Sequence, residues 1–155
     1  MLPQRHAPAH PPIVQSWNRP VIIFLTVCTE KRKPILANRG AVELLLEAWQ
    51  EANQWLVGRF VIMPDHIHLF CSPAMLDACS LNRWVTFWKS AVSKHWPQPE
   101  EQPIWQKDHW DHQLRREESY GKKWDYVRQN PVRHQLVQRV EEWPYQGEMN
   151  VLRWE

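Results

Sequence analysis

Two histidines one residue apart, His66 and His68, lie in an apolar run that follows a Met-Pro-Asp turn. In an extended strand, successive side chains point to opposite faces, so both imidazoles share one face and Ile67 lies on the other. Two imidazoles at this spacing can jointly hold a divalent metal ion, and burial of Ile67 fixes the strand that carries them. Asp65 is expected to serve the turn, with a supporting role next to the metal ligands as the alternative.

A tyrosine near the other end of the sequence is a candidate nucleophile. Residues 117–130 are predicted to form a helix whose apolar seam consists of Tyr120, Trp124 and Val127. Because a helix advances about 100° per residue, Tyr126 lies roughly 120° from the centre of that seam. Asn130 follows one turn later on the same side, and Pro131 is expected to end or bend the helix.

These groups together indicate chemistry on a phosphodiester. A phenol can attack phosphorus and form a covalent phosphotyrosine, which splits one difficult step into two easier ones. The pKa of a free phenol is about 10, so the attack needs help at neutral pH. A divalent cation held by His66 and His68 would stabilise the developing charge, and Asn130 could supply a third ligand oxygen. The residues therefore predict a metal-dependent transesterase with Tyr126 as its nucleophile.

The elements that must position these groups are expected in the order β-α-β-β-α-β. They comprise strand 21–29, helix 41–53, strand 55–63, strand 66–72, a helix between Ser80 and Pro97, and strand 104–114. This order is the ferredoxin-like arrangement of an α+β fold, in which both crossover helices cover one face of an antiparallel sheet. Ile67 and Leu69 should face those helices, so the two histidines should lie on the open face. The C-terminal helix that bears the tyrosine is the segment left to cover that face.

Composition indicates one soluble domain. The chain has 155 residues and a formal charge of +2. Proline-rich residues 1–16 are expected to form an irregular arm, and residues 17–155 a single domain. Three cysteines without paired spacing indicate reduced thiols; they are Cys28, Cys71 and Cys79. The longest apolar run is too short to span a bilayer and no signal peptide is evident, so a cytoplasmic protein is expected.

Two motifs, residues 63–69 (Met-Pro-Asp-His-Ile-His-Leu) and 124–134 (Trp-Asp-Tyr-Val-Arg-Gln-Asn-Pro-Val-Arg-His), carry a resemblance to a known family. With them in this order, the chain resembles the REP-associated tyrosine transposases, which are single-tyrosine HUH transposases. The resemblance covers nearly the whole chain after the N-terminal arm. Gln135 departs from it, since relatives often have glycine there, and Gly121-Lys122-Lys123 is an unusual lead into the helix.

The resemblance implies a role for each candidate residue. His66 and His68 would be the metal ligands for Mg²⁺ or Mn²⁺, Tyr126 the nucleophile, and Asn130 a third metal-binding residue. Family members act as endonucleases and strand transferases on single-stranded DNA, often next to hairpins. They join a 5′ phosphate to tyrosine and free a 3′ hydroxyl. A homodimer is expected for this chain, with a monomer as the alternative.

Clusters of basic residues are candidates for contact with DNA phosphates, a contact that weakens as salt rises. The candidates are Arg19, Lys31, Arg32, Lys89, Arg115 and Lys123. Among the 11 tryptophans, Trp105 or Trp110 could stack on bases.

Two other functions stay open at this point. A domesticated relative could hold hairpin DNA, or RNA on its open sheet, without cleaving it. A structural zinc protein could add His109 and His112 to the first two histidines. Tyr126 argues against both, because neither function needs it.

Overall fold

The computed structural model of the protein describes His10, residues 21–115 and residues 119–153. The irregular arm expected over residues 1–16 lies outside the described residues except for His10, and so does Arg19.

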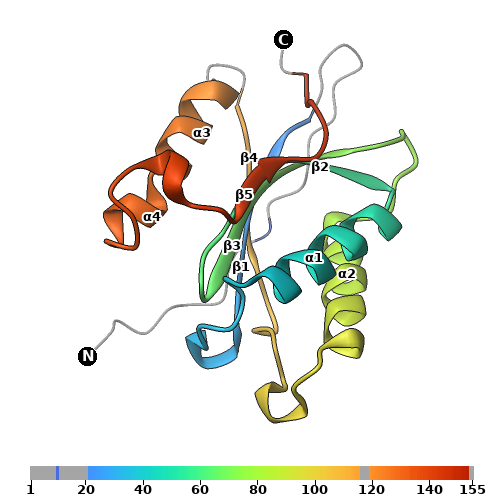
Figure 1. The fold of residues 1–155 in the computed structure, drawn as a ribbon. Coiled ribbons are helices and arrows are strands. Elements are labelled where there is room, and N and C mark those ends of the chain that lie inside the picture. The colour runs from blue at the N-terminus through green and yellow to red at the C-terminus, as the bar shows by residue number, and fades with distance from the viewer. Residues whose placement is uncertain (1–9, 11–20, 116–118, 154–155) are drawn as a thin grey trace.

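Five strands form one antiparallel sheet, with helices on both of its faces (Figure 1). The strands are β1 (Ile23–Cys28), β2 (Trp55–Ile62), β3 (His66–Pro73), β4 (Trp110–Gln113) and β5 (Gln146–Glu148). The α-helices are α1 (Arg39–Glu51), α2 (Leu81–His95), α3 (Tyr120–Val127) and α4 (Asn130–Arg133). Short 3-10 helices are η1 (Glu30–Arg32), η2 (Pro99–Glu101) and η3 (Val140–Glu142).

The strand order β4-β1-β3-β2-β5 matches the predicted ferredoxin-like arrangement in its first four members. Each neighbouring pair is antiparallel. The fifth strand pairs with the outer edge of β2, an addition that the sequence analysis did not foresee. No helix in the described ranges has both the length and the apolar character that a bilayer crossing requires.

Both crossover helices begin where a polar side chain satisfies a free backbone N–H group. Asn38 accepts a hydrogen bond from the N–H of Ala41 at the start of α1, and Ser80 accepts one from Arg83 at the start of α2. The helices then bury one apolar side against the sheet, mainly with Leu45, Trp49, Trp84, Val85 and Trp88.

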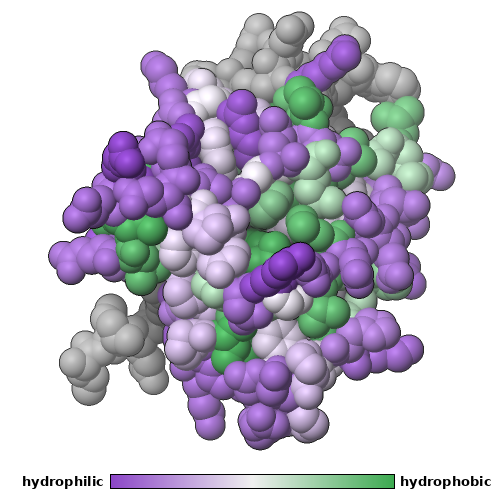
Figure 2. All heavy atoms as spheres, viewed as in Figure 1, coloured by the Kyte–Doolittle hydropathy of each residue, from purple (hydrophilic) through white to green (hydrophobic). Residues whose placement is uncertain are grey.

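The two faces of the sheet are covered differently. In Figure 1 the sheet is seen nearly edge-on, with α1 and α2 on one side and α3 and α4 on the other. Ile67 and Leu69 belong to the large core under α1 and α2, as predicted. Phe70, from the opposite side of β3, belongs to a smaller cluster that includes Tyr120 and Trp124 of α3. Figure 2 shows that the surface of this view is mostly hydrophilic.

The fourth strand is shorter than the sequence predicts. Its expected range is 104–114, but β4 spans Trp110–Gln113, and Trp105 forms only an isolated bridge with Thr29. Between them, the side chain of Asp108 accepts a hydrogen bond from the backbone N–H of His109. Such a local turn replaces the ladder hydrogen bonds that a continuous strand would make.

The predicted helix over 117–130 is two helices in the structure. Residues 117 and 118 lie outside the described ranges, and Ser119 caps α3 by accepting from the N–H of Lys122. After a break, α4 begins at Asn130 with Pro131 in its first turn, where the missing N–H of proline is tolerated. The helix therefore ends before Pro131, as expected, but the break falls at residues 128–129 and Asn130 belongs to the helix that follows.

Candidate active site

His66 and His68 lie side by side on β3, on the face of the sheet turned away from α1 and α2. Their ring centroids are 4.7 Å apart. The register pairs His68 with Thr26 of β1, and side chains alternate along both strands. His66 exposes 6% of its surface and His68 is partly exposed. The two imidazoles therefore lie next to each other on the open face, as the spacing of His66 and His68 predicts.

Each imidazole is held through the same ring atom. Nδ1 of His66 lies 2.8 Å from Oδ1 of Asp65, and Nδ1 of His68 lies 2.9 Å from Oγ1 of Thr26. Ligand histidines in metalloproteins are typically oriented in this way by a carboxylate or another polar group. In both residues, the partner at Nδ1 leaves Nε2 as the ring atom for a metal.

The electrostatics of the pair favour neutral imidazoles, the form that binds metals. Burial lowers the pKa of His68 to about 3, and nearby positive charges, including that of Arg133, act in the same direction. Burial also lowers the pKa of His66, although the hydrogen bond from its Nδ1 to Asp65 acts in the opposite direction. Burial alone would raise the pKa of Asp65, but hydrogen bonds from Arg32 and His66 hold it below its usual value. The donor set therefore fits a divalent cation.

Arg32 reaches the site from the loop that follows β1. Its Nε donates to Oδ2 of Asp65 at 2.9 Å, and its Nη2 lies 3.3 Å from Nδ1 of His66. Lys31 and Arg32 have φ angles of 57° and 54°, in the left-handed region that few non-glycine residues adopt. Such backbone conformations cost about 1–3 kcal/mol each and cluster at functional sites. The backbone of η1 is thus strained at the residue whose side chain binds Asp65.

Tyr126 lies on α3 with 66% of its surface exposed. The guanidinium of Arg133 sits 4.3 Å from the centroid of its ring, and Nη1 donates to the backbone oxygen of Tyr126 at 2.9 Å. Nη2 of Arg133 donates to Oδ1 of Asn130 at 3.0 Å. Arg133 therefore holds the candidate nucleophile and Asn130 together, and its charge also acts on His68. The sequence analysis did not single out Arg133, although it lies within the motif 124–134.

His134 is a second residue of this region that the sequence analysis missed. Its ring centroid lies 6.4 Å from that of His66, and its backbone N–H donates to the carbonyl of Asn130 at 3.0 Å. In the sequence, the feature that could have pointed to His134 is its position at the end of the motif 124–134. Because Oδ1 of Asn130 already accepts from Arg133, His134 is an alternative to Asn130 as a third ligand. His66, His68 and His134 do not offer one ring nitrogen each that all lie within 4.8 Å of one another.

One predicted DNA-contacting residue lies over the open face itself. Nζ of Lys123, on α3, is 5.4 Å from the ring centroid of Phe24. Phe24 in turn stacks on His68, with ring centroids 5.2 Å apart. An aromatic ring and a cation therefore lie directly beside the histidine pair.

The other predicted DNA-contacting residues lie in several places. Arg32 is at the site, and Lys31 and Arg115 are exposed. Lys89 lies on α2, beyond the opposite face of the sheet, and its Nζ donates to the carbonyl of Gln106 at 2.8 Å. Of the basic candidates, Lys89 is thus remote from the two histidines.

Two further sequence hypotheses are not supported by the structure. Trp105 cannot offer a free face to a base, because it is buried with 8% exposure and packs edge-on against Trp88. The four-histidine zinc site is not assembled either, because His109 packs against His10 instead. Among the described residues, the group of ligand atoms close enough to share a metal ion contains neither His66 nor His68. Trp110 remains partly exposed on β4.

Comparison with known proteins relates this arrangement to DNA-processing proteins. Two curated proteins, one of Haemophilus influenzae and one of Escherichia coli, are each 30% identical to the chain, over 96 and 95 residues. Both carry the name REP-associated tyrosine transposase. The chain is related to the REP-associated tyrosine transposases. The matches cover 54% and 61% of this chain and 53% and 52% of the relatives, so the chain spans about half their length.

Solved structures support the fold. The structure of a REP-associated tyrosine transposase bound to a REP hairpin matches with a TM-score of 0.68 and 23% identity, over 88% of this chain and 82% of that one. A Deinococcus radiodurans protein described as a transposase matches with a TM-score of 0.53 and 17% identity, over 74% and 93%. No protein-family model matches the chain. The resemblance drawn from the two sequence motifs is therefore confirmed by relatives, and the α+β fold by structures.

Proposed function

We propose that the protein is a metal-dependent transesterase that nicks and rejoins single-stranded DNA next to hairpins. The observation that carries this proposal is the meeting of two segments on one face of the sheet. His66 and His68 present Nε2 atoms there, and α3 and α4 bring Tyr126 and His134 to the same side. The names of the relatives support a transposase-type reaction.

Tyr126 would supply the nucleophile. Its hydroxyl oxygen attacks the phosphorus atom, forming a bond between that oxygen and the 5′ phosphate while the bond to the 3′ oxygen breaks. The proton that the phenol loses is balanced by the proton that the leaving 3′ oxygen gains. Attack of the 3′ hydroxyl of another strand on the phosphotyrosine reverses the step and completes strand transfer. The exposure of Tyr126 supports access by a strand of DNA.

His66 and His68 would hold the cation, with Asn130 or His134 as the third protein ligand. When bound, a cation such as Mg²⁺ or Mn²⁺ supplies charge stabilisation at the phosphate oxygens. Asp65 and Thr26 orient the two ligand rings through Nδ1. Arg133, stacked on Tyr126, holds the ring of the nucleophile in place.

Hairpin-flanked DNA is the proposed substrate. One structural relative is bound to a REP hairpin, and Lys123 and Phe24 line the open face beside His68. Arg32, Lys31 and Arg115 are proposed to contact DNA phosphates on this face or at its edges, and Arg19 is a further candidate. Lys89 is proposed only for contacts with DNA away from the face that carries the histidines. A homodimer in solution is proposed as well.

The test is a covalent-trapping assay with single-stranded DNA that carries a hairpin, with Mn²⁺ present. Wild-type protein is expected to form an adduct that survives denaturing electrophoresis. Tyr126→Phe should abolish the adduct and still bind the hairpin. Tyr145→Phe, at a tyrosine whose ring packs against Trp143, is the matched control and should behave like wild type. An adduct that persists in Tyr126→Phe would contradict the assignment of the nucleophile.

The same assay addresses the alternative of a non-cleaving binding protein. Tight binding of the hairpin by wild-type protein, with no adduct under Mg²⁺ or Mn²⁺, would favour that alternative. The orientation of Oδ1 of Asn130 toward Arg133, rather than toward an open ligand position, is the feature consistent with it.

A further inference from the structure

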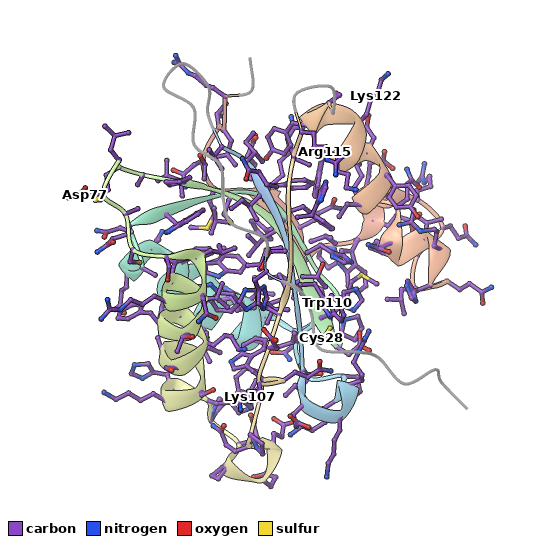
Figure 3. The ribbon with its side chains drawn as sticks, turned by 180° about the vertical axis from the view of Figure 1, so that it is seen from behind. Cys28, Asp77, Lys107, Trp110, Arg115 and Lys122 are labelled. Atoms are coloured by element: carbon purple, nitrogen blue, oxygen red, sulfur yellow. The ribbon has the colours of Figure 1, made fainter. Side chains whose placement is uncertain are left out.

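A second group of histidines and carboxylates lies where the edge strand β4 begins. In Figure 3, β4 with Trp110 runs along the near edge of the sheet, and Lys107 lies just before it. The chain turns between these two residues, with Asp108 accepting from the backbone N–H of His109 at 2.9 Å. The turn brings Asp108, His109 and Asp111 together at the edge.

His10 closes this group from a distant part of the chain. Its Nε2 lies 2.6 Å from Oδ1 of Asp108, and its Nδ1 contacts Oδ2 of Asp111. His109 approaches the same two carboxylates, with Nε2 3.4 Å from Asp111 and Nδ1 4.0 Å from Asp108. One ligand atom each of His10, Asp108 and His109 lies within 4.8 Å of the others. Among the described residues, this is where three such ligand atoms meet.

Burial and charge make this group different from a solvated surface pair. His109 exposes 3% of its surface, and the side chain of Asp111 exposes 8%. The carboxylates of Asp108 and Asp111 both contact His10. The charge of Lys89 acts on His109 and Asp108, while its Nζ donates to the carbonyl of Gln106. Close carboxylates in a part-buried place favour a bound cation as their counter-charge.

The group is separate from the histidine pair of the candidate active site. Asp111 pairs with Leu25 in the register of β1 and β4, and Leu25 belongs to the core under α1 and α2. His68 pairs with Thr26, whose side chain lies on the other face. Alternation along β1 therefore places the two groups on opposite sides of the sheet.

We infer that His10, Asp108, His109 and Asp111 form a second metal site, one that takes Zn²⁺ or a similar transition-metal ion. Two imidazoles and two carboxylates are a donor set that suits Zn²⁺, whereas Mg²⁺ prefers oxygen ligands and water. The ion would fasten the N-terminal segment at His10 to the edge of the sheet. It has no part in the phosphodiester chemistry, so the inference does not depend on the proposed function.

The test is Zn²⁺ stoichiometry and affinity, measured by equilibrium dialysis on the full-length chain without a purification tag. A His66→Ala/His68→Ala background removes the other histidine pair. In that background one Zn²⁺ is expected to bind, and His10→Ala should weaken its binding by more than about 100-fold, beyond the loss that follows removal of a group that only supports a ligand. His95→Ala, at an exposed histidine of α2, is the matched control and should bind as the background does.

A second signal guards against misfolded variants. Co²⁺ in place of Zn²⁺ should give the visible absorption of a tetrahedral site, and Asp108→Asn should remove it while the circular dichroism stays unchanged. If the background binds no Zn²⁺, or if His10→Ala and Asp108→Asn bind it unchanged, the group is only a network of ion pairs and the inference is wrong. Formation of the Tyr126 adduct is a separate readout. It is expected to persist when His10→Ala is made in the chain with His66 and His68 intact, so failure of either proposal is seen independently.

Discussion

The two faces of the sheet differ in how they are covered and in the residues that they carry. Under α1 and α2, the face is filled by large apolar side chains, with Trp88 in contact with Trp49, Trp84 and Trp105. The opposite face has a smaller apolar cluster that includes Phe70, together with a pair of imidazoles on the same strand. The part of this face that the helices cover can supply stability but no access. The partly covered face can bring ionisable groups from distant segments to a substrate.

The cover on the second face explains this difference. Helix α3 packs Tyr120 and Trp124 against Phe70, with ring centroids 4.8 Å and 6.4 Å away. This contact fixes the helix and leaves Tyr126 on its exposed side. The short α4 then carries His134 toward His66. One small hydrophobic contact therefore positions the candidate nucleophile without closing the site.

The largest expected effect is on stability, from the covered face. Trp88→Ala should lower the free energy of unfolding by about 3–5 kcal/mol, because it removes a fully buried indole and leaves a cavity. Phe87→Ala, at the neighbouring and 54% exposed residue, should change it by less than about 0.5 kcal/mol. Chemical denaturation followed by fluorescence measures both. Equal effects at the two positions would contradict the claim that the buried contacts between α2 and the sheet supply the stability.

The second effect is on activity, from the open face. His68→Ala should reduce adduct formation with hairpin DNA by more than about 100-fold, since even the loss of a group that only orients a metal ligand costs 10–100-fold. Its effect on stability should be smaller than that of Trp88→Ala. Single-turnover gel assays and denaturation curves give the two numbers. A variant that unfolds like Trp88→Ala, or one that forms adduct at the wild-type rate, would assign His68 to the structure instead of the chemistry.

The third effect concerns the support of the metal ligands. Asp65→Asn keeps the size of the side chain but removes the negative charge of the carboxylate. That carboxylate pairs with Arg32 and accepts a hydrogen bond from His66. Affinity for Mn²⁺ should fall by about 10–100-fold. Asp77→Asn, at an exposed aspartate in the loop between β3 and α2, should leave it unchanged. Titration calorimetry compares the two, and a drop in both variants would point to bulk charge as the cause.

The smallest effect is expected in the turn after α4. Gln135 has a φ of 60°, a left-handed backbone conformation in which a side chain costs about 1–2 kcal/mol. Gln135→Gly should raise the free energy of unfolding by up to about 1 kcal/mol, because the greater freedom of glycine in the unfolded chain offsets part of the gain. Thermal or chemical denaturation can resolve this, and a loss of stability would show that the glutamine side chain makes a net favourable contribution.

Local patterns in the sequence were enough to predict most of the fold. The alternation through residues 66–71 and the stripes of α1 and α2 depend on neighbours a few residues away, so they can be recognised in the chain itself. The short β4 was missed because the turn at Asp108 depends on one side chain in place of a periodic pattern. The addition of β5 was missed because three residues are too few to show alternation.

The site was predictable only in part, for a related reason. His66 and His68 share a face because of their spacing, and that part was visible. Arg32, Arg133 and His134 meet the pair through tertiary packing, which no spacing encodes. His10 lies about a hundred residues from its partners in sequence, so its position next to Asp108 and Asp111 could emerge only from the fold.

The central claim is that Tyr126 and the histidine pair act on the same phosphate. Protease digestion of the trapped protein–DNA complex, followed by mass spectrometry, identifies the residue that carries the nucleotide. We expect the phosphate on Tyr126, and only when both His66 and His68 are intact and Mn²⁺ or Mg²⁺ is present. A nucleotide attached to another residue, or attached to Tyr126 in a His66→Ala/His68→Ala variant at the wild-type level, would contradict the account.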